Sequence, residues 1–173
     1  MAHTQIETKR LIAKALTTDE LKEFAILPGK IAVKMNINIP PGEPDNELSD
    51  AIVNSLLPGA DGSGPYYLFY TLWMIISKHT NEMVSSFCFH GKPKNRAVEV
   101  GYGINPLSQN RGYITEMLSG IIGWIKHRED IDFLTAETGI ENIPSKKALV
   151  KAGFTLIEIK ENSLIYSICL TNL

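Results

Sequence analysis

Residues 102–116 of this chain of 173 residues read YGINPLSQNRGYITE. This segment starts as the end of a strand, which stops at Ile104, and then runs through Pro106 and a polar stretch to Gly112, directly ahead of an amphipathic helix. Backbone N–H groups at a helix start have no partner inside the helix, and the helix dipole favours negative charge there. The junction therefore suits a diphosphate, although a glycine ahead of a helix is also ordinary loop-to-helix geometry.

Two other phosphate motifs are excluded at this junction. No Gly-Lys-Ser/Thr follows Gly112, so the stretch is not a P-loop, and the further glycines of a dinucleotide fingerprint are missing. Behind Gly112, apolar residues recur at the i, i+3, i+4 and i+7 spacing of a helix with one buried face. These residues are Ile114, Met117, Leu118, Ile121, Ile122 and Ile125.

Upstream of the junction, residues 66–77, 84–90 and 97–104 are rich in aromatic and β-branched side chains and are separated by short polar turns. This pattern predicts three sequential antiparallel strands. Before these strands, the sequence predicts a strand at 10–16, a helix that begins at the Thr17–Glu20 capping box and ends before Pro28, a loop at 37–46, and a helix at 47–57 ended by Pro58-Gly59. After the amphipathic helix, it predicts a strand at 131–137, a helix at 144–152 closed by Gly153, and a hairpin of 154–160 with 163–170.

The order β-α-α-β-β-β-α-β-α-β-β predicts one α+β domain over residues 1–173, with a mixed, largely antiparallel central sheet and flanking helices.

With 44% hydrophobic and 21% charged residues the chain is expected to fold, and a net charge of −2 argues against nucleic acid as a partner. The longest apolar run, residues 66–76, is too short to span a bilayer. The start, MAHTQIETKR, has no secretion signal, so we expect a cytoplasmic protein. Cys88 and Cys169 have no metal spacing, and we expect no metal.

Two segments, EVGYGINPLSQNRGYITEML and TGIENIPSKKALVKAGF, resemble the signature regions of the GCN5-related N-acetyltransferase (GNAT) superfamily. The likeness is greatest to its branch of ribosomal-protein N-terminal (alanine/serine) acetyltransferases, whose first strand and helix the opening IETKRLIAKALTTDEL also resembles. The resemblance covers residues 6–170 and implies a GNAT-like fold, acetyl-CoA as co-substrate, and acetyl transfer to a primary amine. A protein N-terminus is favoured as acceptor. A small-molecule amine, a non-catalytic CoA-binding regulatory module and an interaction domain without cofactor stay open, as does the choice between monomer and homodimer.

The resemblance also implies which residues bind the cofactor. In the family, a Gln/Arg-x-x-Gly-x-Gly/Ala loop holds the acyl-CoA pyrophosphate, and here it would consist of Gln109, Asn110, Arg111, Gly112, Tyr113 and Ile114, with Ile114 in place of the last small residue. The strand end that pairs with the pantetheine arm would be Tyr102, Gly103 and Ile104. Asn142 would bind a pantetheine amide, unless it only caps a helix. The Ser145 hydroxyl would reach the cofactor sulfur and protonate the leaving thiolate.

Glu99 is the predicted general base. It shares a strand face with Gly101 and Gly103, and an amine that attacks a thioester must lose a proton to a group within reach. The alternative is a solvated carboxylate on an open sheet face. Residues 23–65 and the final hairpin are expected to build the acceptor pocket, and His90 could line it, although a surface position is more common for such a histidine.

Overall fold

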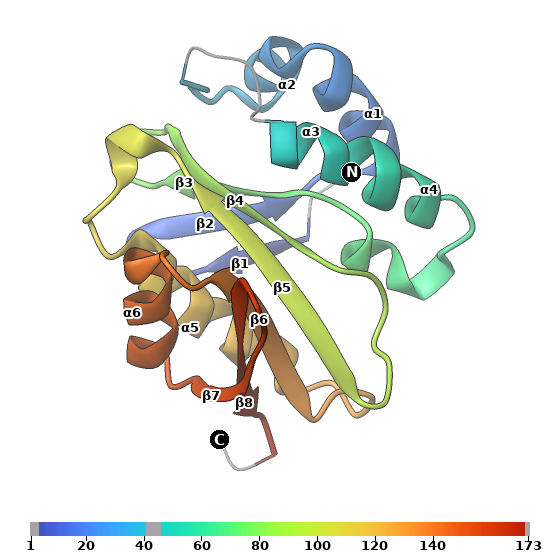
Figure 1. The fold of residues 1–173 in the computed structure, drawn as a ribbon. Helices are drawn as coiled ribbons and strands as arrows, with labels where there is room; N and C mark the ends of the chain where they lie inside the picture. Colours follow the sequence, from blue (N-terminus) through green and yellow to red (C-terminus); the bar gives the residue numbers. More distant parts are fainter. Residues whose placement is uncertain (1–3, 41–45, 172–173) are drawn as a thin grey trace.

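The computed structural model describes residues 4–40 and 46–171, so part of the predicted 37–46 loop and the first three residues lie outside the described chain. Within these ranges the chain forms an eight-stranded sheet in the order β1-β2-β3-β4-β5-β6-β8-β7 (Figure 1). Every neighbouring pair is antiparallel except β5 with β6. This mixed sheet with helices packed on it confirms the predicted fold class.

The strands are β1 (Gln5–Glu7), β2 (Leu11–Ala15), β3 (Trp73–Ser77), β4 (Met83–Phe89), β5 (Ala97–Ile104), β6 (Phe133–Gly139), β7 (Thr155–Ile159) and β8 (Ser163–Cys169). The helices are α1 (Thr18–Ile26), α2 (Pro28–Met35), α3 (Asn46–Ala51), α4 (Leu57–Ala60), α5 (Tyr113–Ile125) and α6 (Ile143–Lys151). Between α3 and α4 lies a π-helical turn, Ile52–Leu56, and two 3-10 turns occupy Gly64–Phe69 and Pro106–Ser108.

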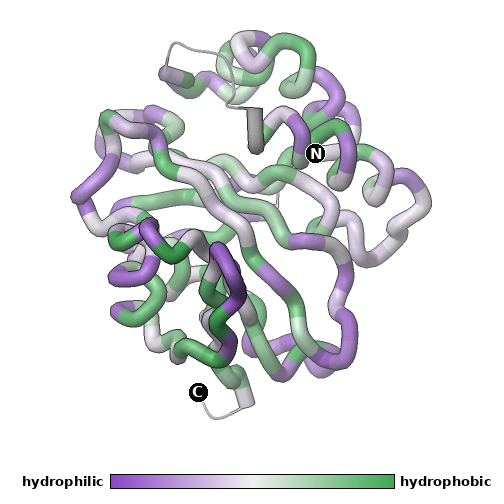
Figure 2. Tube along the Cα trace, viewed as in Figure 1, coloured by the Kyte–Doolittle hydropathy of each residue, from purple (hydrophilic) through white to green (hydrophobic). Residues whose placement is uncertain are grey.

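The two faces of the sheet bury two separate cores. Side chains alternate along β4, so that Phe87 and Phe89 belong to the core beneath α5 and α6, whereas Cys88 belongs to the core beneath α1 to α4. Figure 1 shows these two groups of helices on opposite sides of the sheet, and Figure 2 shows the hydrophobic stretches that run along the strands and α5. Alternate residues of one strand therefore contribute to two separate cores.

Strands β5 and β6 separate after a short parallel ladder. Their pairing ends at Glu99 with Thr135, after which β5 continues beside β4 and β6 continues beside β8 (Figure 1). We call the space between residues 100–104 of β5 and 136–139 of β6 the β5–β6 wedge. At the wide end of the wedge, Cβ atoms added at Gly103 or Gly139 would meet nothing within 4 Å, so the sheet faces at these two residues are uncovered. Helices α5 and α6 follow β5 and β6 in the chain and begin beside this end.

The first predicted central strand starts later than the sequence indicated. Residues 66–69 belong to a 3-10 turn with Pro65 near its start, and the strand begins only at Trp73. The turn is held by the Trp73 indole, whose Nε1–H donates to the Leu68 carbonyl at 3.0 Å, and by burial of Phe69. Aromatic side chains fill a core equally well from a tight turn, so their enrichment alone could not place the strand boundary.

Two elements near the N-terminus were not predicted. Pro28 was interpreted as the end of a helix, but it is also the first residue of a second one, α2, because proline lacks only an N–H that has no partner at a helix start. Leu27, with φ −150° and ψ 81°, separates the two helices. The short edge strand β1 pairs with β2 through Gln5 to Glu7 and carries too few residues for a period-two pattern.

The predicted helix end at Pro58-Gly59 was also wrong, since helical structure continues to Ala60. The turn ahead of it is widened, with Leu57 N–H donating to the Ile52 carbonyl five residues back. A widened turn relieves the clash that proline makes inside a regular helix. A Cβ on Gly59 would lie 2.0 Å from the Tyr70 ring, so the glycine is required by close packing and does not terminate the helix.

Candidate active site

The predicted phosphate loop ahead of α5 has the backbone of an anion cradle. Asn110 has φ 59° and Gly112, the residue before the helix, has φ 73°, and no side chain caps the first turn. Left-handed residues close to a helix start turn successive N–H groups toward one point. Residues 109–112 are exposed, so these N–H groups can reach a ligand. Ile114 packs against the core beneath α5, which takes its branched side chain away from the loop.

Two predicted cofactor residues that are 43 positions apart meet beside the wedge. The hydroxyl oxygens of Tyr102 on β5 and Ser145 on α6 lie 2.8 Å apart, in hydrogen-bond contact. Burial raises the pKa of Tyr102, and the hydrogen bond with Ser145 only partly opposes this. The tyrosine therefore stays protonated at neutral pH and can pass a proton to Ser145.

Asn142 occupies the cap position of α6. Its Oδ1 accepts a hydrogen bond from the Ser145 backbone N–H at 3.2 Å, so the structural interpretation from the sequence is confirmed. This cap fixes the first turn of α6 and with it the backbone that carries Ser145. Binding of a pantetheine amide by Asn142 stays a prediction.

Glu99 pairs with His90 on the opposite face of β5 from Tyr102. His90 Nδ1 lies 2.8 Å from Glu99 Oε1, and the His90 backbone N–H donates to the Glu99 carbonyl at 2.9 Å. The imidazole lies across Gly101, where an added Cβ would come within 2.5 Å of Nε2. Hydrogen bonds to Cys88 and Glu99 raise the pKa of His90 to about 10. The sequence placed His90 more readily at the surface, and the structure places it half-exposed beside the predicted base.

Glu137 on β6 was missed by the sequence analysis. It follows Thr135 by one alternation of the strand, and Thr135 pairs with Glu99, so both glutamates lie on the same sheet face. The Ser163 hydroxyl and Lys160 Nζ, the latter at 2.9 Å, donate to its carboxylate and lower its pKa. The signal was a single acidic residue in a strand in which every second residue, Leu134, Ala136 and Thr138, is buried.

We expect the His90 ring to remain an imidazolium at neutral pH. Its pKa is raised above the ordinary value of 6.5, so its contribution to stability is complete below about pH 6.5 and is lost as the pH rises through about 10. An NMR titration of the ring, assigned with His90→Gln, should give a midpoint near pH 10 in the wild type and a lower one in Glu99→Gln. A wild-type midpoint near 6.5 would contradict the pairing.

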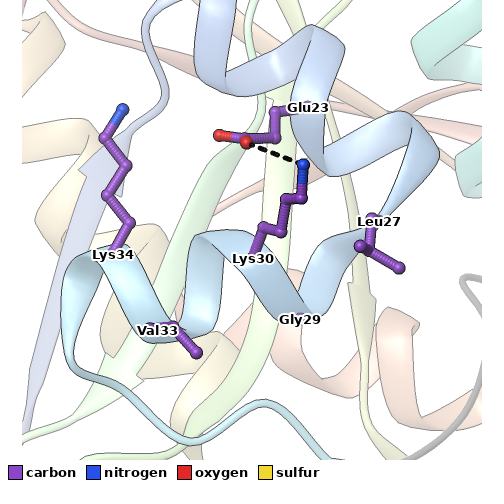
Figure 3. A pocket seen from close by; sticks show the side chains of 6 residues that line it. All are labelled: Glu23, Leu27, Gly29, Lys30, Val33 and Lys34. Carbon is purple, nitrogen blue, oxygen red and sulfur yellow. Dashed lines mark ion pairs between the residues drawn. The ribbon is translucent and has the colours of Figure 1, made fainter.

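A hollow of about 530 Å³ lies on the first two helices and is lined by Glu23, Leu27, Gly29, Lys30, Val33 and Lys34. Figure 3 shows Lys30 and Glu23 facing each other, with Nζ and Oε1 3.8 Å apart. The hollow falls within residues 23–65, where the sequence predicts the acceptor pocket. None of its lining residues belongs to β4, β5 or β6, so the hollow shares no residue with the candidate cofactor-binding and catalytic residues.

Residues 4–40 and 46–171 contain no group of three or more His, Cys, Asp or Glu side chains arranged to hold a metal ion. Over the same residues, no helix combines the length and the apolar character needed to cross a bilayer.

The family of the chain follows from comparison with known proteins. Residues 10–155 match the family model described as an acetyltransferase (GNAT) domain. The chain therefore belongs to the class of GNAT acetyltransferases, as the two signature segments predicted.

Individual relatives agree with this class. The chain is 34% identical over 85 residues to the uncharacterized N-acetyltransferase YjdG of Bacillus subtilis strain 168, a stretch that covers 49% of this chain and 51% of YjdG, about half the length of each protein. Among solved structures, RimL, a ribosomal L7/L12 α-N-protein acetyltransferase in complex with coenzyme A, aligns with a TM-score of 0.66 at 17% identity, covering 96% of this chain and 98% of that one. A putative ribosomal-protein-serine acetyltransferase of Vibrio cholerae aligns with a TM-score of 0.64 at 18% identity, covering 96% and 97%. At these identities the structures show a shared fold.

Acetyl-CoA, which GNAT acetyltransferases use, fits the residues present. The left-handed Gly112 leaves the cradle free of a side chain, and residues 100–104 of β5 and 136–139 of β6 are not paired with each other, which leaves their backbone edges to a ligand. The hydroxyl pair of Tyr102 and Ser145 lies beside this end of β5.

Proposed function

We propose that this protein is an acetyl-CoA-dependent N-acetyltransferase that acts on a primary amine by direct attack. The observation that carries the proposal is the placement of the two candidate proton-transfer groups on opposite faces of β5 beside the β5–β6 wedge. Residues 99 and 102 are an odd number of positions apart, so Glu99 and Tyr102 project to opposite sides of the sheet. An amine and a leaving thiolate on opposite sides of a thioester require this arrangement.

Binding would be divided among three segments. The N–H groups around Gly112 would hold the diphosphate, the backbone of Tyr102 to Ile104 would pair with the pantetheine arm, and Asn142 would bind one of its amides. The wedge supports the second role, because the edge of β5 that faces β6 has left the parallel ladder beyond Glu99. The co-substrate supplies the acetyl group as a thioester.

The two proton transfers would take place on opposite faces of β5. Glu99, held by His90, accepts the proton of the incoming amine directly or through one water. Ser145 donates a proton to the departing sulfur and recovers it from Tyr102, whose hydroxyl is 2.8 Å away. A backbone amide near Val100 polarises the carbonyl.

Glu99→Gln is expected to lower kcat/KM by roughly 10² to 10⁴, the usual range for the loss of general base catalysis. The affinity for acetyl-CoA should stay within about threefold, because Glu99 lies on the face away from Ser145. Thiol release gives the rate and calorimetry the affinity. Glu137→Gln is the matched control: it removes a carboxylate from the same face, but one that accepts hydrogen bonds from the Ser163 hydroxyl and Lys160 Nζ. A larger loss in Glu137→Gln than in Glu99→Gln would transfer the base role to Glu137.

For the acceptor, we propose the α-amine of a protein or peptide. Support comes from the branch that the sequence resembles and from the ribosomal-protein acetyltransferases among proteins of the same fold. The test incubates the enzyme and acetyl-CoA with one peptide in free and N-terminally blocked forms and with a panel of polyamines. A mass increase of one acetyl group on the free peptide alone is expected. Acetylation confined to polyamines would overturn the acceptor, and binding without thiol release would support the non-catalytic module.

A further inference from the structure

The turn between β1 and β2 is fastened to the first turn of α5 through Glu116. Oε1 of Glu116 accepts from the Thr8 hydroxyl at 2.6 Å and from the Arg10 backbone N–H at 2.7 Å, and Oε2 accepts from Arg10 Nε at 2.6 Å. Burial acts to raise the pKa of Glu116, but the bonds from Thr8 and Arg10 prevail and lower it. A segment more than 100 residues away in the sequence thus holds the first turn of α5 in place.

The rest of the Arg10 guanidinium contacts the phosphate loop itself. Nη1 donates to the Arg111 carbonyl at 3.0 Å, and the group lies 4.9 Å from the centre of the Tyr113 ring. Nη2 lies 3.6 Å from where a Cβ on Gly112 would be. Arg10 therefore touches three consecutive residues of the loop from the side.

The Nη2 group still has donor capacity. In the chain that the structure describes, Nη2 makes no hydrogen bond, whereas Nε and Nη1 are both engaged. The Arg10 side chain is 46% exposed, so the group is accessible to a ligand. A guanidinium held by two of its nitrogens presents the third in a fixed direction, and phosphate is the anion that this fork recognises best.

We propose that Arg10 is a cofactor-binding residue, with Nη1 shaping the loop through Arg111 and Nη2 donating to a diphosphate oxygen of the bound acyl-CoA. The inference rests on the proposed function, because it assigns a ligand to the cradle at Gly112. It adds a binding residue from the opposite end of the sheet order, where β1 and β2 lie. Lysine could not replace the arginine, since one ammonium group cannot reach Glu116, Arg111 and a phosphate in the same fixed geometry.

The test measures binding of CoA and dephospho-CoA by calorimetry to the wild type and three variants, with thermal unfolding as the folding check. Arg10→Gln should weaken both ligands by about 10-fold to 100-fold, as for one charge-assisted hydrogen bond. Lys9→Ala removes a neighbouring exposed charge and should change affinity by less than about twofold. Glu116→Gln loosens the anchor but keeps the cation, and it should cost less than about threefold. If Arg10→Gln does not fold, Arg10→Lys replaces it and should weaken binding at least about fivefold.

Three results would overturn the proposal. Equal losses in Arg10→Gln and Glu116→Gln would mean that Arg10 only anchors the loop. A loss with CoA that disappears with dephospho-CoA would move the contact to the 3′-phosphate. Unchanged affinity in Arg10→Gln would remove the contact altogether. Failure of the wild type to bind CoA is a separate outcome, which would contradict the proposed function before Arg10 is tested.

Discussion

Gly112→Val is expected to weaken acetyl-CoA binding by at least about 100-fold while the protein stays folded. Gly112 has φ 73°, and a β-branched residue in that region is strained by about 1–3 kcal/mol. The loop relieves this strain by turning, which misdirects the N–H groups at the start of α5, and each lost hydrogen bond to a charged phosphate weakens binding by roughly 10-fold to 100-fold. Calorimetry measures the affinity, and circular dichroism shows that the fold persists.

Gly123→Val provides the matched control for Gly112→Val. Gly123 lies within α5, is exposed, and an added Cβ there meets nothing within 4 Å. The same chemical change should leave acetyl-CoA affinity within about twofold and raise helix propensity by a few tenths of a kcal/mol at most. Wild-type affinity in Gly112→Val would show that the loop holds no phosphate.

Ser145→Ala is expected to lower turnover by roughly 10² to 10⁴ with acetyl-CoA affinity kept within a few-fold. The hydroxyl is the group in contact with the Tyr102 hydroxyl, so its removal interrupts the proposed path of the proton to the sulfur. The partly buried Tyr102 hydroxyl also loses its partner, which should lower the free energy of unfolding by about 1 kcal/mol. Single-turnover thiol release separates the chemical step from binding.

Ser119→Ala is the control for Ser145→Ala, because Ser119 is an exposed serine whose hydroxyl donates only to the Thr115 carbonyl within its own helix. It should keep turnover within about twofold. Turnover at the wild-type level in Ser145→Ala, together with reduced stability, would mean that Ser145 serves only the start of α6.

Local signals in the sequence predicted the fold well where a few adjacent residues decide the backbone. The capping box was confirmed, with Thr17 accepting from the Glu20 N–H at 3.3 Å and Glu20 accepting from the Thr17 N–H at 3.0 Å. The start of α5 at Tyr113, directly after Gly112, was confirmed as well. Both depend on contacts between neighbours in the chain, which a pattern of residue types describes directly.

Prolines were less informative, because the same residue serves opposite purposes. Pro28 begins a helix and Pro58 lies within a widened one, although both were interpreted as helix ends. Which purpose applies depends on the packing of the flanking turns, such as that of Tyr70 on Gly59. Packing between distant segments is not visible in local composition.

In the candidate active site, too, local sequence signals were predictive and contacts between distant segments were not. Gly112 and Ser145 were found from short motifs, but the pairs formed by Tyr102 with Ser145, His90 with Glu99, and Arg10 with Glu116 depend on strand register and on helix placement. Register brings Glu99 opposite His90 and lets the imidazole lie over Gly101, a relation that a single sequence does not contain. The sequence therefore identified candidate residues, whereas the structure identified their partners.

The central claim is that the β5–β6 wedge and the loop at Gly112 bind acetyl-CoA. The most direct measurement is calorimetric titration of the wild-type protein and Gly112→Val with acetyl-CoA under one set of conditions. We predict a one-to-one complex for the wild type, with a dissociation constant of about 1 μM to 1 mM, the range typical of enzyme substrates, and no measurable complex for the folded variant. Absence of binding to the folded wild type, or equal binding to both proteins, would contradict the claim.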